Sequence, residues 1–443
     1  MLYWKRTIDQ EDTKGRLFMA SPNDYQPILL GSDATVYGMA RNFYSLTGKP
    51  VDTYARRQLA PTQWSRIVNV HIIPELDSDT AFVPAMVKVA AAHAQQGPLL
   101  LIACTDTYAE LVARHKEELS AYFVCPSVDY SLMKQLNDKE QFYNLCAEYG
   151  LPYPDTKIIT RAMYDSGVSI TSPYSFPVML KPTESVEWLD ISFQGRKKVF
   201  TIHSQVELNT IVARIYEQDY RYDLVLQDFI PGDDSHMRVL NVYVDAQHHV
   251  KLMALGHPLL VDPSPAALGN VMAMLPEFDQ QLYDLVQPFL EGVGYTGIAN
   301  FDIKFDYRDQ TYKLLEINMR PGRSGYFVTL NGYNVAEWLV RDYVTHDLDA
   351  LDTVYANDDP RRAYLWLGVT RRLFKRYAPD GHLKERALRL MDEGRVGTTL
   401  FEPRDFSIRR WLLIHRLFFG YNTLYKRYFA EMKGNLEEAT NGN

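Results

Sequence analysis

The chain has 443 residues, 46% of them hydrophobic and 23% charged, and its formal net charge is −8. This length predicts two or three globular domains, and three widely spaced cysteines, Cys104, Cys125 and Cys146, exclude a disulfide framework and a cysteine-based metal site. No N-terminal signal pattern is present, and no apolar run reaches the roughly 18 residues of a membrane-spanning helix. We therefore expect a soluble protein of the reducing cytoplasm, in contact with a membrane at most peripherally.

The charge is unevenly distributed along the chain. Residues 361–433 contain 17 Lys and Arg residues but only 7 Asp and Glu residues, so the rest of the chain is strongly acidic. A basic segment attached to an acidic body predicts an anionic partner near that end of the molecule.

Residues 1–25 are polar and without periodicity, and we expect them to form an N-terminal arm. Residues 26–128 then alternate strand and helix patterns, which is typical of a doubly wound parallel α/β domain. The first strand ends at the Gly-Ser-Asp turn 31–33, and a helix is expected from about Thr35. This turn is either an anion site at a helix N-terminus or an ordinary connection; it lacks the G-x-G-x-x-G pattern of a dinucleotide site. Asp106 follows a later strand at its carboxyl end, where open α/β sheets bind ligands.

A lysine at the end of a buried strand is the next notable feature. An amphipathic helix is predicted from about Lys139 to a stop at Gly150, and the strand 178–180 then delivers Lys181 directly before Pro182. A lysine in this position is costly unless it meets an anion, although its side chain can also extend to solvent.

Strands are predicted at 224–227 and 238–244, and between them a Pro-Gly turn is followed by two acids, the second being Asp234. Acids in this position are usually part of the turn itself. The region 256–270 has the pattern of a long connection, and a helix is expected at about 277–292.

The stretch 297–326 predicts a β-hairpin followed by a Pro-Gly turn. Apolar and polar residues alternate from 299 to 305 and again from 315 to 320, with the odd positions apolar and Leu315 among them. Alternation with a period of two indicates two half-buried strands.

If the hairpin loop is 308–310, Asp302 lies opposite Glu316 and Asn300 lies opposite Asn318. Opposed side chains are about 5 Å apart at Cβ, where like charges repel each other. Two carboxylates and an amide on one face favour a hard cation such as Mg²⁺, because all of the ligands are oxygens. The alternative is a solvated sheet face without a metal.

Five motifs follow one another in an order that resembles the ATP-grasp superfamily of carboxylate–amine ligases. They are DK at 138–139, VMLKP at 178–182, QDFIPGDD at 227–234, NFD at 300–302 and EINMRPG at 316–322. The segments ILLGSDATVYGMAR and EINMRPGRSGYFVTLNGYN are in addition similar to bacterial D-aspartate ligases.

The resemblance implies an α/β (α+β) fold with four parts. They are the arm 1–25, a doubly wound pre-ATP-grasp domain at 26–128, a two-part ATP-grasp module at 129–345 with a lid subdomain at about 155–230, and a helical basic segment at 346–443. The flexible loop of the lid normally carries several small residues, whereas 183–195 contains only Ser185, Ser192 and Gly195.

The resemblance also implies where ATP binds. Lys139 and Lys181 would contact its phosphates, Asp234 its ribose, and 227–230 its adenine, with backbone groups of Phe229 and Ile230 reading the edge of the base. Arg238 is a further candidate on the phosphate side. The implied nucleotide-binding residues are thus Lys139, Lys181, Gln227, Asp228, Phe229, Ile230, Asp234 and Arg238.

By the same resemblance, Asp302, Glu316 and Asn318 would hold Mg²⁺, with Mn²⁺ as the alternative ion. Arg320 or Arg323 would neutralise an acyl phosphate and the tetrahedral intermediate that follows it. The chemistry is consistent with these parts, because phosphoryl transfer to a carboxylate needs positioning and charge neutralisation rather than a protein nucleophile.

The implied function is an ATP-dependent ligase that joins the β-carboxylate of D-aspartate to the lysine ε-amine of an anionic peptidoglycan precursor. Two alternatives remain: a ligase for another amino acid or amine, and a non-catalytic nucleotide-binding protein. The second is disfavoured because Lys181, Asp302, Glu316, Asn318 and Arg320 are all present. No recognised nucleic-acid-binding motif is present.

The segment 407–432 is aromatic, basic and periodic like a helix. It is either a terminal helix packed on the body, which would bury Trp411, Leu412 and Phe418, or a helix that lies on the anionic inner surface of the membrane. In the second case, deleting 407–443 is expected to weaken binding to anionic vesicles and to spare ATP hydrolysis.

Overall fold

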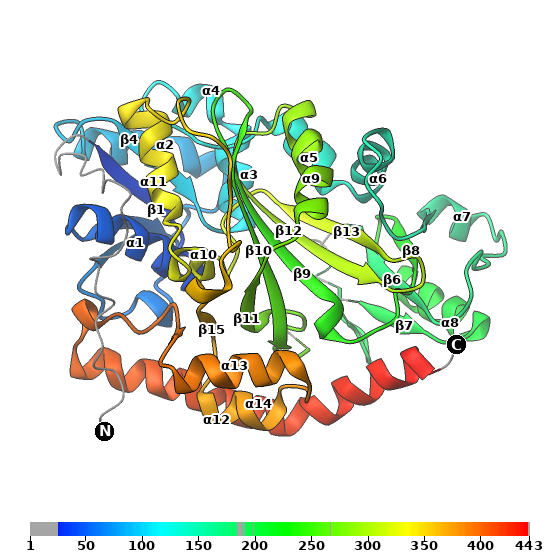
Figure 1. The fold of residues 1–443 in the computed structure, drawn as a ribbon. Coiled ribbons are helices and arrows are strands. Elements are labelled where there is room, and N and C mark those ends of the chain that lie inside the picture. The colour runs from blue at the N-terminus through cyan, green and yellow to red at the C-terminus, as the bar shows by residue number, and fades with distance from the viewer. Residues whose placement is uncertain (1–24, 184–187, 189–190, 198, 266, 442–443) are drawn as a thin grey trace.

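A computed structural model of the protein describes residues 25–183, 188, 191–197, 199–265 and 267–441. The predicted arm lies outside this range except for Tyr25, which is buried in the core. The described residues form three sheets with helices packed around them, and the C-terminal helix runs along one edge of the molecule (Figure 1). The domain boundaries proposed from the sequence remain predictions.

The first sheet is parallel, with the strand order β3-β2-β1-β4. Helix α1 (Ala34–Thr47) covers one face, while α2 (Asp79–Ala92) and α3 (Asp106–Arg114) cover the other. This is the doubly wound arrangement predicted from the alternation of strand and helix patterns. The strands are β1 (Gln26–Leu30), β2 (Val51–Ala55), β3 (Val68–Ile72) and β4 (Leu99–Ala103).

The second sheet is small and antiparallel, with the order β5-β8-β6-β7, and lies in the region expected to be the lid. Its outer face is covered by α8 (Gln205–Tyr216), whose buried residues join the hydrophobic cluster of the sheet. The strands are β5 (Thr156–Ile159), β6 (Val178–Pro182), β7 (Phe200–Ile202) and β8 (Leu224–Asp228).

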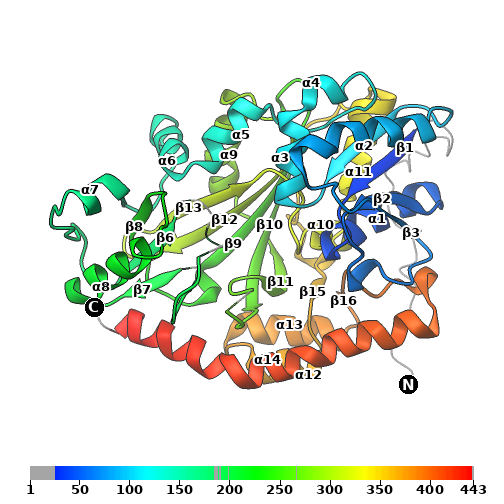
Figure 2. The same cartoon turned by 180° about the vertical axis from the view of Figure 1, so that it is seen from behind.

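The third sheet is the largest, with the order β13-β12-β9-β10-β11-β15-β16, and β14 pairs with β10 (Figure 2). One face packs against α6 (Lys139–Glu148) and α9 (Gln280–Gly292), and the other packs against α1 and α11 (Val335–Val340). The strands are β9 (Met237–Val244), β10 (Val250–Val261), β11 (Val271–Glu277), β12 (Gly297–Asp306), β13 (Thr311–Asn318), β14 (Val354–Tyr355), β15 (Leu365–Leu367) and β16 (Val396–Gly397).

The long connection predicted at 256–270 is wrong in its first part, because β10 continues to Val261. Every residue of β10 is buried, so the strand lacks the alternation that would have identified it. Pro258 and the irregular pairing that follows it interrupt the pattern further.

The β12–β13 hairpin has the predicted register at its functional end, with Asn300 opposite Asn318 and Asp302 opposite Glu316. The loop is 307–310, one residue longer than predicted, and Leu314 rather than Leu315 pairs with Ile303.

Leu315 is therefore the extra residue of a β-bulge, and Leu314 is the buried one. The expectation that Leu315 lies on the apolar face is wrong, because the bulge changes the parity of the strand at this point.

The C-terminal region is mainly helical, as predicted, with α12 (Arg371–Tyr377), α13 (His382–Asp392) and α14 (Ile408–Asn441). Helix α14 buries Ile414, Phe418 and Tyr425 against the body. Trp411 and Leu412, which were expected to be buried, are 40% and 57% exposed, because the buried stripe begins one turn later. Within the described residues, no helix is long and apolar enough to cross a bilayer.

Shorter helices complete the connections between these layers. They are α4 (Lys116–Leu119), α5 (Tyr130–Asn137), α7 (Arg161–Asp165) and α10 (Tyr326–Leu330).

Candidate active site

The candidate site begins on the face of β12 and β13 that carries the even-numbered residues of β12. Asp302 lies opposite Glu316, and one pair further along Asn318 donates from Nδ2 to the carbonyl oxygen of Asn300 at 3.4 Å. The Asn300 side chain donates in turn to Asn241 Oδ1 of the neighbouring strand β9 at 3.0 Å. Adjacent strands thus hold a row of oxygen-bearing side chains in register.

Asp302 and Glu316 form a carboxylate pair that is unfavourable without a cation. Burial and the adjacent Glu316 raise the pKa of Asp302, while Arg320 and Lys139 oppose this shift. The described residues contain no group of three His, Cys, Asp or Glu side chains that could hold a metal by themselves. Two carboxylates with the amide oxygen of Asn318 suit Mg²⁺, which proteins commonly bind with few side chains while phosphate oxygens and water complete the shell.

Lys139 lies at the edge of this carboxylate pair. It is the first residue of α6, a helix capped by Asp138, whose carboxylate accepts from the backbone N–H of Gln141 at 2.9 Å. The ammonium group is 3.3 Å from Glu316 Oε2 and 3.4 Å from the carbonyl oxygen of Leu315. The bulge at Leu315 thus provides a backbone acceptor that holds the lysine beside the acid.

The segment 227–230 follows this group along the chain. Gln227 is buried and donates to Tyr143 Oη at 2.9 Å, and Asp228 pairs with Arg308 at 2.6 Å. Both side chains are thus paired with other residues of the protein, so the backbone groups of the segment are the ones available to contact a ligand.

Lys304 is a site residue that the sequence interpretation missed. Its ammonium group donates to the carbonyl oxygens of Ile230 at 2.7 Å and Gly232 at 2.9 Å, and lies over the ring of Phe229. Burial lowers the pKa of Lys304 to about 8. The sequence could have indicated this residue, because Lys304, like Asp302, is a polar residue at an even-numbered position of β12.

Asp234 lies just beyond this segment. Burial, with a smaller contribution from the Asp233 carboxylate, raises the pKa of Asp234 to about 6, while Lys304 opposes the shift. A carboxylate in this environment gains from any ligand that donates hydrogen bonds to it.

The two candidate catalytic arginines have different partners. Arg320 forms a two-pronged pair with Asp106 at 2.6 and 3.1 Å, and also donates to Asn318 Oδ1 at 3.2 Å. Asp106 begins α3 at the carboxyl end of β4, so this ion pair joins the first sheet to the hairpin. Arg323 is exposed and donates to Tyr421 Oη of α14 at 3.1 Å.

Two further predicted residues lie on other strands. Arg238 is in register with Ile303, so its side chain is on the opposite face of the sheet, where it pairs with Glu277 and donates to the carbonyl oxygen of Ser235 at 3.0 Å. Lys181 lies half-buried on β6 of the small sheet, in register with Val225.

Part of the predicted lid loop cannot be placed. Ser185 lies outside the described residues, while Ser192 and Gly195 are described. The role proposed for this loop therefore stays a prediction.

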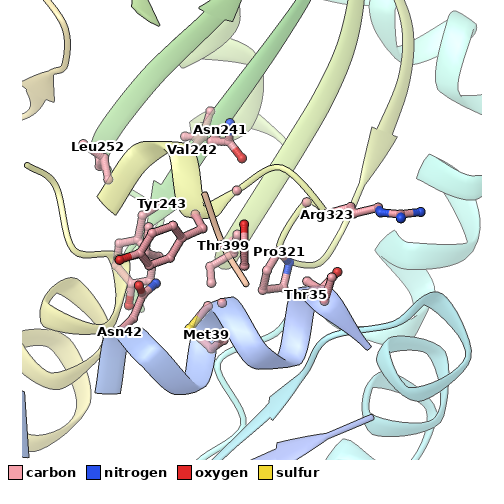
Figure 3. Close-up of a pocket in the computed structure, with 17 residues that line it drawn as sticks. Thr35, Met39, Asn42, Asn241, Val242, Tyr243, Leu252, Pro321, Arg323 and Thr399 are labelled. Atoms are coloured by element: carbon pink, nitrogen blue, oxygen red, sulfur yellow. The ribbon is translucent and has the colours of Figure 1, made fainter. Parts of the chain in front are cut away.

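An apolar cavity of about 30 Å³ lies between α1, β9 and the loop that follows the hairpin (Figure 3). Met39 and Asn42 line it from the helix, Asn241 lines it from the strand, and the Arg323 side chain extends away from it. A water needs at least about 10–15 Å³ measured in this way, so the cavity is too small for an amino acid.

Comparison with protein-family models finds no match. Among curated proteins, the D-aspartate ligase of Enterococcus faecium (strain Aus0004) is 47% identical over 414 residues, which cover 93% of this chain and 98% of the relative. The chain belongs to the D-aspartate ligase family. The predicted resemblance is thereby confirmed, and the protein is an ATP-dependent, amide-forming ligase.

Solved structures confirm the predicted ATP-grasp fold of this ligase. An N5-carboxyaminoimidazole ribonucleotide synthetase in complex with ADP matches with a TM-score of 0.54 and 11% identity, over 76% of this chain and 80% of that one. The biotin carboxylase domain of the Hydrogenobacter thermophilus 2-oxoglutarate carboxylase, in complex with MgADP, ADP and bicarbonate, matches with a TM-score of 0.54 and 14% identity, over 75% and 71%.

Proposed function

We propose that this ligase activates the β-carboxylate of D-aspartate with ATP and joins it to the lysine ε-amine of a peptidoglycan precursor stem peptide. The observation that carries the activation step is the facing pair Asp302 and Glu316, with Lys139 at 3.3 Å from Glu316. The identity with the Enterococcus faecium D-aspartate ligase supports the choice of donor. The amino-acid donor and ATP are small, water-soluble molecules, which is consistent with a cytoplasmic enzyme, and the reaction gives no role to nucleic acid.

The activation step follows from the charges at this site. A carboxylate is a poor acylating agent, and transfer of the γ-phosphoryl group of ATP converts it into an acyl phosphate with a good leaving group. Asp302, Glu316 and Asn318 would hold Mg²⁺, or Mn²⁺ as the alternative, which would neutralise negative charge on the phosphates when bound. Lys139 and Lys181 are proposed to neutralise the remaining phosphate charge.

The second step is attack by the lysine amine on the acyl phosphate. Negative charge then develops on the carbonyl oxygen, and preorganised donors stabilise it most effectively where water is excluded. Arg323 has the available positive charge for this task, whereas Arg320 is already paired with Asp106. We propose that Arg320 fixes the end of the hairpin and that Arg323 contacts the reacting groups.

The nucleotide is proposed to lie along the segment 227–230. The carbonyl of Ile230 is bonded to Lys304, so contact with the adenine edge falls to other backbone groups of Phe229 and Ile230. Asp234 would accept hydrogen bonds from the ribose hydroxyls. Gln227 and Asp228 hold the segment in place through Tyr143 and Arg308. Arg238 stabilises the opposite face of the sheet through Glu277 and is not proposed to contact the phosphates.

A phosphate-release screen over D- and L-amino acids, with a muramyl pentapeptide as acceptor, tests the substrate assignment. We expect release to depend on ATP, on Mg²⁺, on the acceptor and on D-aspartate, with L-aspartate much weaker. Phosphate release only with a donor other than aspartate would refute the substrate assignment but not the ligase reaction.

We also propose that α14 contacts an anionic membrane surface. Its outward side carries the apolar residues Ile408, Leu412 and Phe419, with the exposed arginines Arg409 and Arg416 beside them. Apolar and cationic side chains on one exposed helix face complement a bilayer with acidic headgroups.

Co-sedimentation with vesicles tests this contact. We expect the wild-type protein to bind anionic vesicles in a salt-sensitive manner, and the double variant Leu412→Asp/Phe419→Asp to bind much less. Val206→Asp is the matched control, because Val206 is 76% exposed on α8, a different helix. Equal sedimentation of the double variant and the wild type would refute the membrane contact.

A further inference from the structure

Helix α14 contributes the hydrogen-bond partner of Arg323, one of the two candidate catalytic arginines. We infer that Tyr421 is a positioning residue for Arg323, so that the C-terminal helix sets the geometry of the arginine that meets the acyl phosphate. This inference deepens the proposed function and rests on the role given to Arg323 there.

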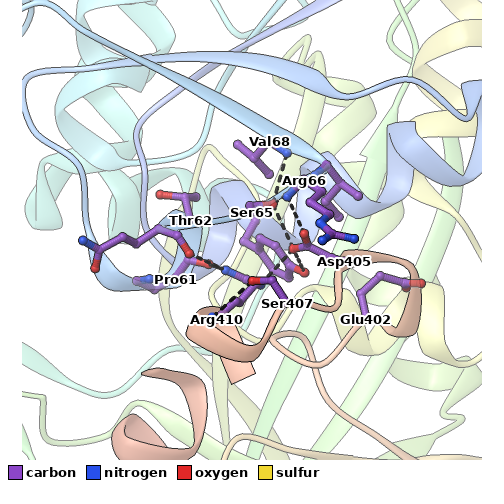
Figure 4. A network of polar contacts seen from close by, with 12 residues as sticks. Pro61, Thr62, Ser65, Arg66, Val68, Glu402, Asp405, Ser407 and Arg410 are labelled. Atoms are coloured by element: carbon purple, nitrogen blue, oxygen red, sulfur yellow. Dashed lines mark hydrogen bonds and ion pairs between the residues drawn. The ribbon is translucent and has the colours of Figure 1, made fainter. Parts of the chain in front are cut away.

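At the start of α14 lies a buried ion pair between Arg410 and Asp405 at 2.8 Å, and both residues bond to the N-terminal α/β region (Figure 4). The Asp405 carboxylate also accepts from Tyr37 of α1 at 2.7 Å and from Ser65 at 2.8 Å. Arg410 donates to the carbonyl oxygen of Pro61 at 2.8 Å. A buried charge pair with several hydrogen-bond partners favours one geometry, so the first turn of the helix is held in place, although Arg410 Nη2 is buried without a partner.

A second anchor lies further along the helix. Tyr425 is fully buried, and its hydroxyl donates to the carbonyl oxygen of Val261 at the end of β10. Tyr421 lies one helical turn before Tyr425, and eleven residues after Arg410, which is roughly 16 Å along the axis. The position of the Tyr421 ring is therefore determined by contacts on both sides of it.

The Tyr421 hydroxyl is the hydrogen-bond partner of Arg323, at 3.1 Å from Nη2. Burial raises the pKa of Tyr421, so the hydroxyl stays neutral while its oxygen accepts this bond. In the described part of the chain Arg323 forms no ion pair within 4 Å, in contrast to Arg320. The neutral hydroxyl orients the guanidinium without cancelling its charge. Arg323 is also close enough to Asp33 to oppose the rise that burial causes in the pKa of that carboxyl, but the two form no ion pair within 4 Å, so N–H groups of the arginine remain for an anion.

A long exposed arginine otherwise samples many rotamers, and ordering it when the substrate binds would cost affinity. The contact with Tyr421 removes part of this cost before binding. The ligand chemistry that benefits is the carboxylate of the donor and the phosphate that is transferred to it, since each presents a pair of oxygens that matches the arginine fork.

The test compares Tyr421→Phe with Tyr425→Phe, each of which removes one hydroxyl from α14. Tyr421→Phe is expected to raise the KM for D-aspartate roughly tenfold, with little change in the KM for ATP. Tyr425→Phe is expected to lower the Tm and to change the KM for D-aspartate much less than Tyr421→Phe does, because the ring at position 425 stays buried against the body. A Tyr421→Phe protein with altered Tm and unchanged KM for D-aspartate would overturn the inference.

A double-mutant cycle with Arg323→Lys separates positioning from a general structural effect. If Tyr421 acts through Arg323, Tyr421→Phe should add little to the kinetic defect of Arg323→Lys, whereas independent roles would multiply the two defects. If another amino acid is the donor, the D-aspartate assignment fails and the same cycle is measured with that donor.

If the wild-type protein uses no amino acid donor, the proposed function fails by itself. The Tm values of the wild type, the two single variants and the double variant then test whether Tyr421 and Arg323 interact. A non-additive change in Tm upholds the coupling between Tyr421 and Arg323, and strict additivity refutes it.

Discussion

At the scale of residues, the pair of Asp302 and Glu316 shows that the site lowers the stability of the fold. The two carboxylates are held opposite each other across the hairpin, although like charges in such a pair repel. Lys139 and Arg320 reduce the repulsion without removing it, as the raised pKa of Asp302 shows. A surface under selection for stability alone would not keep this pair, which supports its role as a cation site.

Replacing Glu316 by Gln should therefore abolish ADP production, with a loss of at least about a hundredfold. The Tm should stay the same or rise, because the change removes a like-charge contact. Glu148→Gln is the matched control, since Glu148 is exposed on α6. Full activity of Glu316→Gln in a coupled ADP assay would contradict the metal assignment.

Asp342 gives a prediction about pH and stability away from the site. Its Oδ2 accepts from Tyr243 Oη at 2.6 Å and from the N–H of Ala246 at 3.1 Å, and burial raises its pKa to about 6. The folded protein thus binds this proton more tightly than the unfolded chain, whose pKa is about 3.9. This group favours folding below pH about 4, and its contribution is lost as the pH rises through about 6.

Asp342→Asn keeps an oxygen acceptor for both donors and removes the charge. It should raise the free energy of unfolding at pH 8 by on the order of 1–2 kcal/mol and change it little at pH 4. Urea unfolding at the two pH values measures this difference. Equal effects at both pH values would show that the pKa of Asp342 is not raised.

At the scale of elements, the β12–β13 hairpin shows what a residue pattern can and cannot reveal. Period-two alternation identified both strands and the facing pairs, because half-buried strands have this pattern. The bulge at Leu315 was not predictable, since Leu314 and Leu315 are equally apolar and either one satisfies the pattern. Its consequence, a carbonyl that binds Lys139, is visible only in three dimensions.

Helix α14 is held to the body by large buried side chains. Phe418→Ala should lower the free energy of unfolding by about 3–5 kcal/mol, because it empties a buried aromatic site. Phe419→Ala is the adjacent control and should cost much less, since Phe419 is 63% exposed. Equal costs in urea unfolding would mean that the helix does not pack as described.

This packing also revises the deletion experiment suggested by the sequence. Removing 407–443 would take Ile414, Phe418 and Tyr425 out of the core, together with Tyr421. The deletion is therefore expected to reduce ATP hydrolysis as well as vesicle binding. Substitutions on the exposed side of α14 are the selective test of the membrane contact.

At the scale of the whole molecule, the candidate site lies where two sheets meet. Asp33 caps α1 just after β1, and Asp106 begins α3 just after β4, so both mark carboxyl ends of the first sheet. Arg320 reaches Asp106 from the loop after β13 of the largest sheet. Open α/β sheets bind ligands at the carboxyl ends of their strands, and the loop after β13 contacts this edge of the first sheet through Arg320.

Most of this architecture was predictable because strand and helix periods, capping residues and turn residues act locally. The order of elements and the facing carboxylates belong to this class. Residues brought together across long sequence separations were not predictable, notably the contact between Arg323 and Tyr421 and that between Lys304 and Ile230. Arg238 was proposed from the resemblance as a further candidate on the phosphate side, yet the register of β9 places its side chain on the opposite face.

The central claim is that a donor carboxylate is activated as an acyl phosphate, and isotope transfer tests it most directly. D-aspartate labelled with ¹⁸O in the β-carboxylate is incubated with the ligase, ATP, Mg²⁺ and a muramyl pentapeptide, and the released phosphate is analysed by mass spectrometry. We predict one ¹⁸O atom in each phosphate, and none when only the α-carboxylate is labelled. Amide formation with unlabelled phosphate in the first experiment would contradict the account.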